Sequence, residues 1–359
     1  MDSVQHAPLM SSPARSTQAI SAYGRALPGL GLVLVLGLAS CASSGPGKAT
    51  LETRSHAEHA TRSGDWRAAA DHWYAIFLDG GCVEVEPCVE TARALIELGD
   101  PESASSIVKL GLDNNPNEPA LLEMEAEALV ASGFRRSAER SYERALAGNP
   151  DSPTCLLGVA RQRMALGKES LAVRPLERLI AMQPEHYEAL TLLARARTAA
   201  GDSPGAFSAW TAAFQIDRGR DTLTPQAIAD RLEAGMLFME SDVQAAYPHA
   251  GETCGRWLAR VLEDDPQCTR AHFELGVLYE RVGRLDLAVE AYRRAVETDP
   301  ACLMALTNLA LLHSVRGEVE QTQALVDRAL SLEPDEGRRR ALKQLAEDCA
   351  RKASQASPR

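Results

Sequence analysis

A small group of potential metal ligands lies near the start of the repetitive part of the chain. His56 and His59 are three residues apart on a predicted helix, and Glu52 lies one turn before them. Imidazole and carboxylate groups are common zinc ligands, but a stable site needs a further ligand and hydrogen-bonded support. The sequence offers neither close by. We therefore interpret these residues as an exposed polar helix face, and we expect no metal and no cofactor.

Two cysteines could form a covalent link. Cys82 and Cys88 flank a short linker, GGCVEVEPC, and could close a small disulfide loop if the chain is exported from the reducing cytosol. The alternative, that both stay reduced, is left open. Cys268 and Cys302 occupy matching places in adjacent repeats, so we expect them to lie too far apart to pair.

The sequence gives no sign of catalysis or of nucleic-acid binding. It contains no glycine-rich phosphate loop, no Gly-x-Ser-x-Gly and no His-Glu-x-x-His. A net charge of −11 repels phosphate backbones. We therefore predict that the chain is not an enzyme and has no nucleic-acid partner and no small-molecule substrate.

A period of 34 residues runs through most of the chain. The repeated marks are glycines (Gly99, Gly133, Gly167, Gly201), alanines (Ala104, Ala138, Ala172, Ala206) and prolines (Pro116, Pro150, Pro184). Glycine favours the left-handed backbone that ends a helix, and proline cannot continue one. Small alanines allow two helices to approach closely. Each period therefore predicts a helical hairpin, and stacked hairpins share one core.

The clearest unit, Thr269 to Cys302, contains Leu275-Gly276, Tyr279, Ala288 and Tyr292, and it resembles the tetratricopeptide repeat. The resemblance implies an all-α solenoid of helical hairpins, wound as a right-handed superhelix behind a cleaved lipoprotein signal peptide. We predict these parts: signal peptide 1–40, flexible tether 41–49, repeat units one to five 50–220, a divergent unit with an insertion 221–268, units seven and eight 269–336, and a capping helix 337–354.

The signal peptide is predicted from an apolar run of about a dozen residues, which is too short to span a bilayer. The run ends in Leu38-Ala39-Ser40-Cys41, which resembles the bacterial lipobox. That resemblance implies cleavage before Cys41 and its lipidation, which would hold the protein at a membrane. Since Ala42 and Ser43 follow rather than Asp, it also implies the outer membrane, facing the periplasm, in a two-membrane source. Met1 and Met10 both remain candidate start codons.

In the tetratricopeptide family the first helix of each hairpin lines a concave groove that binds protein partners. The matching places in this sequence are Arg93, Glu127, Leu157, Arg161, Met164, Arg195, Phe273, Val277 and Glu280. Arg161 and Arg195 hold equivalent places in neighbouring units and could together accept an acidic peptide. The alternative is that these arginines pair with glutamates of their own helices.

Together these features predict a lipid-anchored envelope adaptor or scaffold that binds proteins or peptides. Assembly of an envelope complex or pilus is the role that the resemblance to repeat lipoproteins implies. Two alternatives remain: a scaffold anchored by an uncleaved apolar segment, and an accessory factor of an envelope enzyme. A carboxylate in the groove would be required for any catalytic role, with Glu127 and Glu280 as the residues to test.

Overall fold

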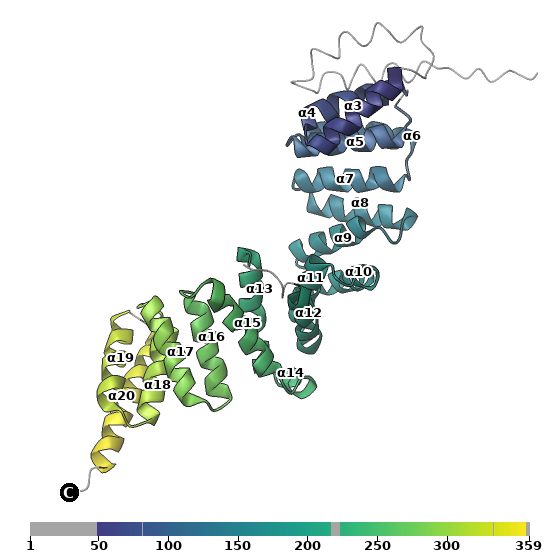
Figure 1. The fold of residues 1–359 in the computed structure, drawn as a ribbon. Coiled ribbons are helices and arrows are strands. Elements are labelled where there is room, and N and C mark those ends of the chain that lie inside the picture. The colour runs from purple at the N-terminus through teal and green to yellow at the C-terminus, as the bar shows by residue number, and fades with distance from the viewer. Residues whose placement is uncertain (1–48, 81, 217–222, 333, 357–359) are drawn as a thin grey trace, which may run out of the picture. The chain divides into compact units, whose positions relative to one another are not determined.

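The computed structural model describes residues 49–80, 82–216, 223–332 and 334–356, and every regular element within these ranges is a helix (Figure 1). The predicted signal peptide, almost all of the tether and Cys41 lie outside the described residues. The chain divides into two compact units between Pro184 and Glu185. The repeat spacing gives no sign of this division, and each unit is described by itself.

The N-terminal unit is a series of antiparallel helix pairs, and each helix packs on the one before it. Its helices are α3 (Ala49–Ser63), α4 (Trp66–Asp79), α5 (Val85–Glu97), α6 (Pro101–Asn114), α7 (Pro119–Ala131), α8 (Arg135–Gly148), α9 (Pro153–Ala165) and α10 (Glu169–Met182). The first helices α5 and α7 of two successive pairs also touch directly.

Local chemistry explains where these helices begin and end. The helices α7 and α9 start at Pro119 and Pro153, where proline loses no hydrogen bond because the first helical amide has no partner within the helix. Gly133 follows α7 with φ of 81°, a backbone conformation that strains residues with a side chain. Asp100 accepts a hydrogen bond from the Ser103 amide and so caps α6.

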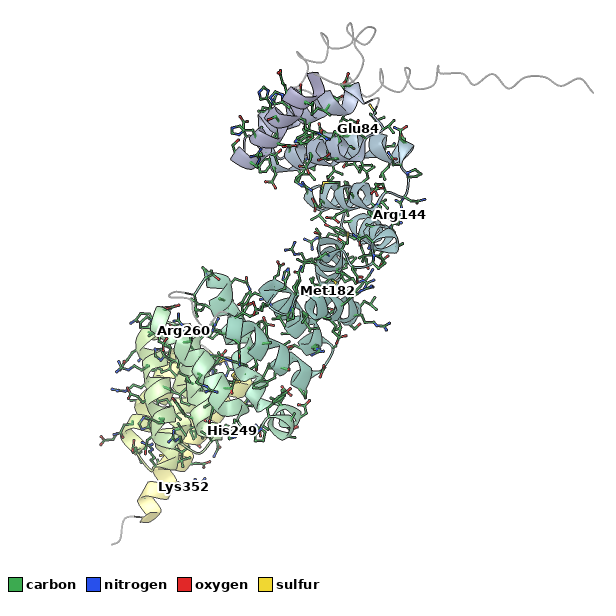
Figure 2. All side chains as sticks on the ribbon, turned by 45° about the vertical axis from the view of Figure 1, so that its right-hand side comes forward. Glu84, Arg144, Met182, His249, Arg260 and Lys352 are labelled. Carbon is green, nitrogen blue, oxygen red and sulfur yellow. The ribbon has the colours of Figure 1, made fainter. Side chains whose placement is uncertain are left out.

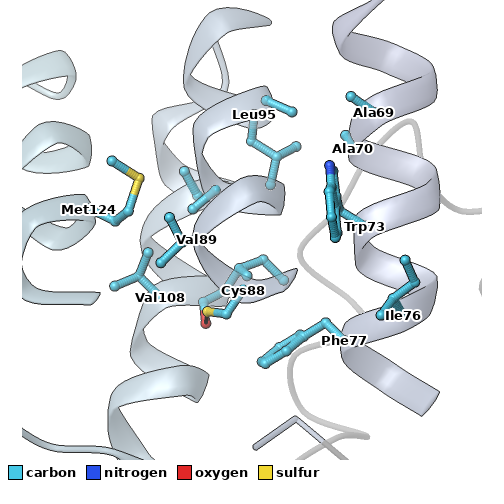
Figure 3. Packing of buried hydrophobic residues seen from close by; sticks show 14 of the residues in the cluster. Ala69, Ala70, Trp73, Ile76, Phe77, Cys88, Val89, Leu95, Val108 and Met124 are labelled. Atoms are coloured by element: carbon cyan, nitrogen blue, oxygen red, sulfur yellow. Dashed lines mark hydrogen bonds between the residues drawn. The ribbon is translucent and has the colours of Figure 1, made fainter. Parts of the chain in front are cut away.

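The core of the N-terminal unit begins with large residues and continues with small ones. Trp73 and Phe77 of α4 are buried beside α5, and Met124 of α7 closes the cluster (Figure 3). Further along, Tyr142 of α8 packs on α9 at Gly158, where an added Cβ would lie 2.5 Å from the tyrosine ring. A glycine is therefore needed for this close helix contact.

The C-terminal unit has the same kind of hairpins, interrupted by an insertion. Its elements are α11 (Tyr187–Ala199), α12 (Ser203–Ile216), α13 (Pro225–Gly235), the 3₁₀ turn η2 (Met236–Met239), α14 (Ser241–Ala246), α15 (Ala250–Asp264), α16 (Thr269–Arg281), α17 (Leu285–Thr298), α18 (Leu303–Val315), α19 (Val319–Ser331) and α20 (Glu336–Ala356). The last helix, α20, packs on α18 and α19 and buries Leu342 there.

An aromatic cluster holds the inserted segment in place. Phe207 of α12 lies 4.7 Å from Tyr247 and 5.3 Å from Trp257, measured between ring centroids. Phe214 contacts Trp257 edge-on at 5.0 Å. Such pairs contribute beyond their buried area, so the short helix α14 is fixed against α12 and α15 although its own length could not stabilise it.

No helix in the described part of the chain has the length and apolar character needed to cross a bilayer.

Candidate protein-binding groove

The predicted groove residues lie on the first helix of each pair. Counting from the first residue of these helices, the face in question is formed by the second, fifth, ninth and twelfth places, and we call it the groove face. In the N-terminal unit Arg93, Glu127, Leu157 and Met164 are half-buried there and Arg161 is exposed. Helix α5 contacts α7, and Cys155 of α9 donates a hydrogen bond to Glu123 of α7, so these side chains form a row over neighbouring helices.

Negative charge dominates the middle of this row. The Glu127 carboxyl is half-buried, and its burial, together with the nearby carboxylates of Glu123 and Glu97, raises its pKa to about 6. Arg93 lowers the pKa only in part, because it also forms an ion pair with Glu90 of its own helix. Burial is therefore the main cause of the raised pKa of Glu127, and the nearby carboxylates add to it.

Glu123 is held in position by the next helix pair. Its Oε2 accepts hydrogen bonds from the Ser152 hydroxyl at 3.1 Å and from the Cys155 thiol at 3.2 Å. Burial raises the pKa of Cys155 to about 12, so this thiol stays protonated and acts as a donor. The carboxylate is therefore positioned between α7 and α9.

In the C-terminal unit the side chain at the equivalent position of α11 is bound by carboxylates of another helix. Arg195 forms ion pairs with the buried Asp230, and with Glu233 at 3.2 Å. Arg195 is thus paired within the chain, but its carboxylates come from α13 and not from its own helix α11, as the alternative expected. Arg195 already has two anionic partners, so it is poorly suited to accept a partner's carboxylate. Arg161, the other arginine of the predicted pair, lies on α9 of the N-terminal unit.

The last groove helices are largely apolar on this face. Phe273 and Val277 of α16 are half-buried and pack against the core. Met304 and Leu311 of α18 are exposed. Glu280 has a structural partner, because its Oε2 accepts a hydrogen bond from the Tyr292 hydroxyl at 2.9 Å.

Sequence reasoning missed three buried charged residues around the insertion. Asp230, Arg231 and Glu274 are nearly inaccessible to solvent. Asp230 accepts hydrogen bonds from Gln226 at 2.8 Å and Tyr187 at 3.3 Å in addition to Arg195. A signal was present, since Asp230 falls between buried Ala227 and Ala234 at helical spacing, where an apolar residue is expected.

Ion pairs away from the groove face range from exposed to mostly buried. Arg144 of α8 lies 3.5 Å from Glu125 with its side chain half-exposed, whereas Arg260 of α15 lies 2.8 Å from Asp264 and both of these side chains are mostly buried. Figure 2 labels Arg144 and Arg260. Exposed pairs contribute little to stability.

The cysteines and histidines form no evident chemical site. Cys82 and Cys88 are both buried free thiols, so the suggested disulfide is not present in the structure. Instead the Cys88 thiol donates to the Ile107 carbonyl at 3.4 Å. Within the described ranges no group of three or more His, Cys, Asp or Glu could hold a metal.

Comparison with known proteins identifies the repeats. The tetratricopeptide-repeat family model matches residues 123–173, 160–221 and 257–301. These matched residues are tetratricopeptide repeats. The helical hairpins and this match together confirm the predicted all-helical solenoid fold. The match indicates no enzyme family, and repeats of this kind mediate protein–protein interaction.

Solved tetratricopeptide structures are similar at low identity. MamA from Desulfovibrio magneticus RS-1 is 18% identical, with 51% of this chain and 96% of that chain covered and a TM-score of 0.43. A repeat protein from Parabacteroides merdae ATCC 43184 is 18% identical, with coverages of 74% and 98% and a TM-score of 0.43. PilF of Pseudomonas aeruginosa is 13% identical, with coverages of 61% and 94% and a TM-score of 0.44. None of these likenesses carries an argument about function. Among curated proteins none matches.

Proposed function

We propose that this chain is a lipid-anchored envelope adaptor, tethered through Cys41, that binds partner proteins through the groove faces of its repeats. The observation that carries the binding role is the row of half-buried and exposed side chains on the first helices. In the N-terminal unit this row holds charges that the fold does not fully neutralise. Such groups gain most from a partner that neutralises them.

The anchor is supported by the sequence around Cys41. An apolar core of signal-peptide length precedes Leu38-Ala39-Ser40-Cys41, and a Ser/Gly-rich stretch leads from there to the first helix at Ala49. Several acyl chains on one cysteine would bind a membrane stably. By the residues after Cys41, the destination is the outer membrane where the source has two membranes. The biological role is assembly of an envelope complex, of which a pilus is one example.

Lipidation is tested by labelling cells with a radioactive or clickable palmitate and measuring the mass of the mature chain. We expect label on the wild type, none on Cys41→Ala, and a mature mass that lacks the first 40 residues. A full-length, unlabelled chain in the membrane fraction would instead establish the uncleaved anchor.

The binding role is tested by purifying the membrane-bound chain in detergent and identifying the proteins that remain with it. We compare Arg161→Glu and Leu311→Glu, one on each groove face, with Glu102→Arg, an exposed change on the second helix α6. A partner that is retained by the wild type and the control, but lost in a groove variant, supports the proposal. If the same proteins bind all four forms, the groove faces are not the binding surface.

A further inference from the structure

Two second helices of the N-terminal unit carry an excess of arginine. The segment 135–178, which contains α8, α9 and most of α10, has nine arginine and lysine residues against five aspartate and glutamate residues, a net charge of +4. The whole chain has a net charge of −11. The exposed cations on α8 and α10 are all arginines. Positive charge is therefore concentrated in one part of an acidic protein.

These arginines lie on an exposed face of each second helix. Counting from the first residue of the helix, the second, sixth, ninth, tenth and thirteenth places of α8 and of α10 are all exposed, and we call them the outward face. The outward face holds Arg136, Arg140 and Arg144 on α8, and Arg174 and Arg178 on α10. It is separate from the groove face, which belongs to the first helices.

The two glutamates of α8 are used by other parts of the fold. Glu139 is buried and accepts from Lys168 at 2.7 Å and from Arg163 at 3.2 Å. Glu143 pairs with the same Arg163 at 2.7 Å. Cations of α9 and of the turn after it therefore neutralise both carboxylates, and the arginines of α8 itself have no share in these ion pairs.

Three of the outward arginines have no ion-pair partner in the described part of the chain, and we call Arg136, Arg140 and Arg174 the arginine patch. Arg136 and Arg140 are four residues apart, so they are neighbours on one face of α8. Arg140 and Arg174 hold the same sixth place of successive second helices. Arg140 donates to the Ser137 hydroxyl at 3.3 Å, which leaves its charge unpaired.

The arginines one turn further along show how this face receives a carboxylate. Arg178 binds Asp151, with Nε at 2.9 Å and Nη2 at 2.8 Å from the same carboxylate oxygen. Arg144, at the equivalent tenth place of α8, lies 3.5 Å from Glu125. The arginine patch presents the same guanidinium chemistry without these internal partners.

The C-terminal unit has the opposite arrangement at the same place of a second helix. The sixth place of α17 is Glu290, which pairs with Arg293 at 2.5 Å and with Arg294 at 3.2 Å. Glu297 pairs with the same two arginines at 3.7 Å and 3.1 Å. The outward charges of α17 therefore neutralise one another within one helix, whereas the sixth place of α8 and of α10 adds positive charge.

The remaining charges nearby do not cancel the arginine patch. Glu177 of α10 is exposed on the outward face and takes part in an interaction within the chain. Counted in full, it still leaves the three arginines with an excess of two positive charges. Arg135 and Glu169, at the first places of α8 and α10, offset one another. Arg161 lies on the first helix α9 and has an interaction of its own, so it is not counted.

We propose that the arginine patch binds an acidic segment of a partner protein, with Arg140 and Arg174 each donating to a carboxylate. This surface lies on the second helices and goes beyond the groove faces proposed above. The planar donors of a guanidinium group match the two oxygens of a carboxylate. Two such groups at equivalent places of successive repeats can engage two carboxylates of one segment.

The surroundings favour an acidic protein segment over a membrane or a nucleic acid. The outward face holds no large apolar side chain, since the exposed Phe134 and Leu171 lie outside it, and helices that bind membranes combine basic residues with Trp, Phe or Leu. A long polyanion would also meet the acidic remainder of the chain. A short segment meets mainly the local charges, because charges farther away than about 8 Å are largely screened at physiological salt.

The test uses the full-length chain in a nonionic detergent and a fluorescent dodecapeptide of alternating glutamate and serine. A glutamine–serine peptide is the neutral control. Fluorescence anisotropy measures binding to the wild type, to Arg140→Gln/Arg174→Gln, and to the matched control Arg293→Gln/Arg294→Gln, whose arginines already have carboxylate partners. Arg161→Glu reports on the groove face, and thermal melting checks that each variant is folded.

We expect the wild type to bind the acidic peptide and not the neutral one, more weakly as salt is raised. The change at Arg140 and Arg174 should weaken binding roughly tenfold or more, because two charge-assisted hydrogen-bonding groups are lost. The matched change on α17 removes the same charge from arginines that are already paired and should leave binding within about twofold.

Three results would overturn the proposal. The first is that the wild type does not bind the acidic peptide, or binds it no better than Arg140→Gln/Arg174→Gln does. The second is a loss of binding in Arg161→Glu alone, which would place the acidic peptide in the groove and support the proposed function instead. The third is binding of a soluble short-chain phosphatidylglycerol that depends on Arg140 and Arg174 without any binding of the peptide, which would assign the arginine patch to anionic lipid.

Discussion

The two units place different side chains at the same position of the repeat, the ninth place of the first helix. In the N-terminal unit this place holds Arg93, Glu127 and Arg161, and in the C-terminal unit it holds Arg195, Val277 and Leu311. Arg93 is paired with Glu90 of its own helix and Glu127 has a raised pKa, whereas Arg195 is paired with α13 and Val277 and Leu311 are apolar. Equivalent positions in a solenoid can therefore differ in both charge and pairing.

Tyr292 and Tyr142, which hold the same place in their repeats, differ in the hydrogen bonding of the hydroxyl group. The hydroxyl of Tyr292 is satisfied by two neighbours, and that of Tyr142 by none in the described chain. A satisfied polar network rigidifies a fold, and an open one is available to a ligand. Three measurements test this contrast between the two units.

The largest effect is expected at Asp230. Changing Asp230→Ala removes a buried carboxylate that accepts from Arg195, Gln226 and Tyr187, and should lower the free energy of unfolding of the C-terminal unit by roughly 3 kcal/mol. Urea denaturation followed by tryptophan fluorescence measures this. The matched change Glu233→Ala removes the exposed partner of the same arginine and should cost less than about 1 kcal/mol. Equal costs would mean that Arg195 does not serve stability through Asp230.

A smaller difference is expected between the two tyrosines. Tyr292→Phe removes a hydroxyl that has two hydrogen-bond partners and should lower stability by about 1 kcal/mol, whereas Tyr142→Phe removes a solvated hydroxyl and should leave stability unchanged. Denaturant midpoints of the two variants measure the difference. A comparable loss in Tyr142→Phe would show that its hydroxyl has a structural role after all.

The smallest effect concerns Glu127 and depends on pH. Its pKa of about 6 lies above the ordinary 4.5, so the folded chain binds this proton more tightly than the unfolded chain. The charged carboxylate therefore opposes folding above about pH 6, and this cost disappears as pH falls toward 4.5. Glu127→Gln should stabilise the N-terminal unit by about 1 kcal/mol or less at neutral pH, after allowance for solvent screening.

The stabilising effect of Glu127→Gln should shrink toward about pH 5, because the wild-type carboxyl is then protonated. Thermal melting of both proteins across this range checks the sign. A stabilisation that grows with acid would contradict the assigned cause of the pKa shift.

Much of the fold followed from local sequence signals. The glycines that close the first helices have φ between 68° and 81°, and prolines stand at the first positions of α7 and α9. These residues act through their own backbone, so their effect is visible without any partner. The surface position of the groove residues could also be predicted, because helical spacing alone decides which side chains share a face.

The ion-pair partners of those residues could not be predicted from the sequence in the same way. Arg195 of α11 pairs with Asp230 of α13, which lies 35 residues later in the chain. The glycines, alanines and prolines that repeat every 34 residues contain no information about which charged side chains will pair. The insertion also shifts the frame, so an expected apolar position holds Asp230 and is stabilised only by partners from other helices. The division of the chain after Pro184 likewise has no counterpart in the regular 34-residue spacing.

The helical hairpin and its period could be predicted from the sequence, because turns, helix ends and amphipathic spacing are properties of neighbouring residues. That Arg195 pairs with Asp230, and that the Tyr292 hydroxyl is hydrogen-bonded to Glu280 and Asn308, became visible only in the folded chain. These outcomes depend on side chains brought together from different helices, where packing distance and burial set which polar groups find partners.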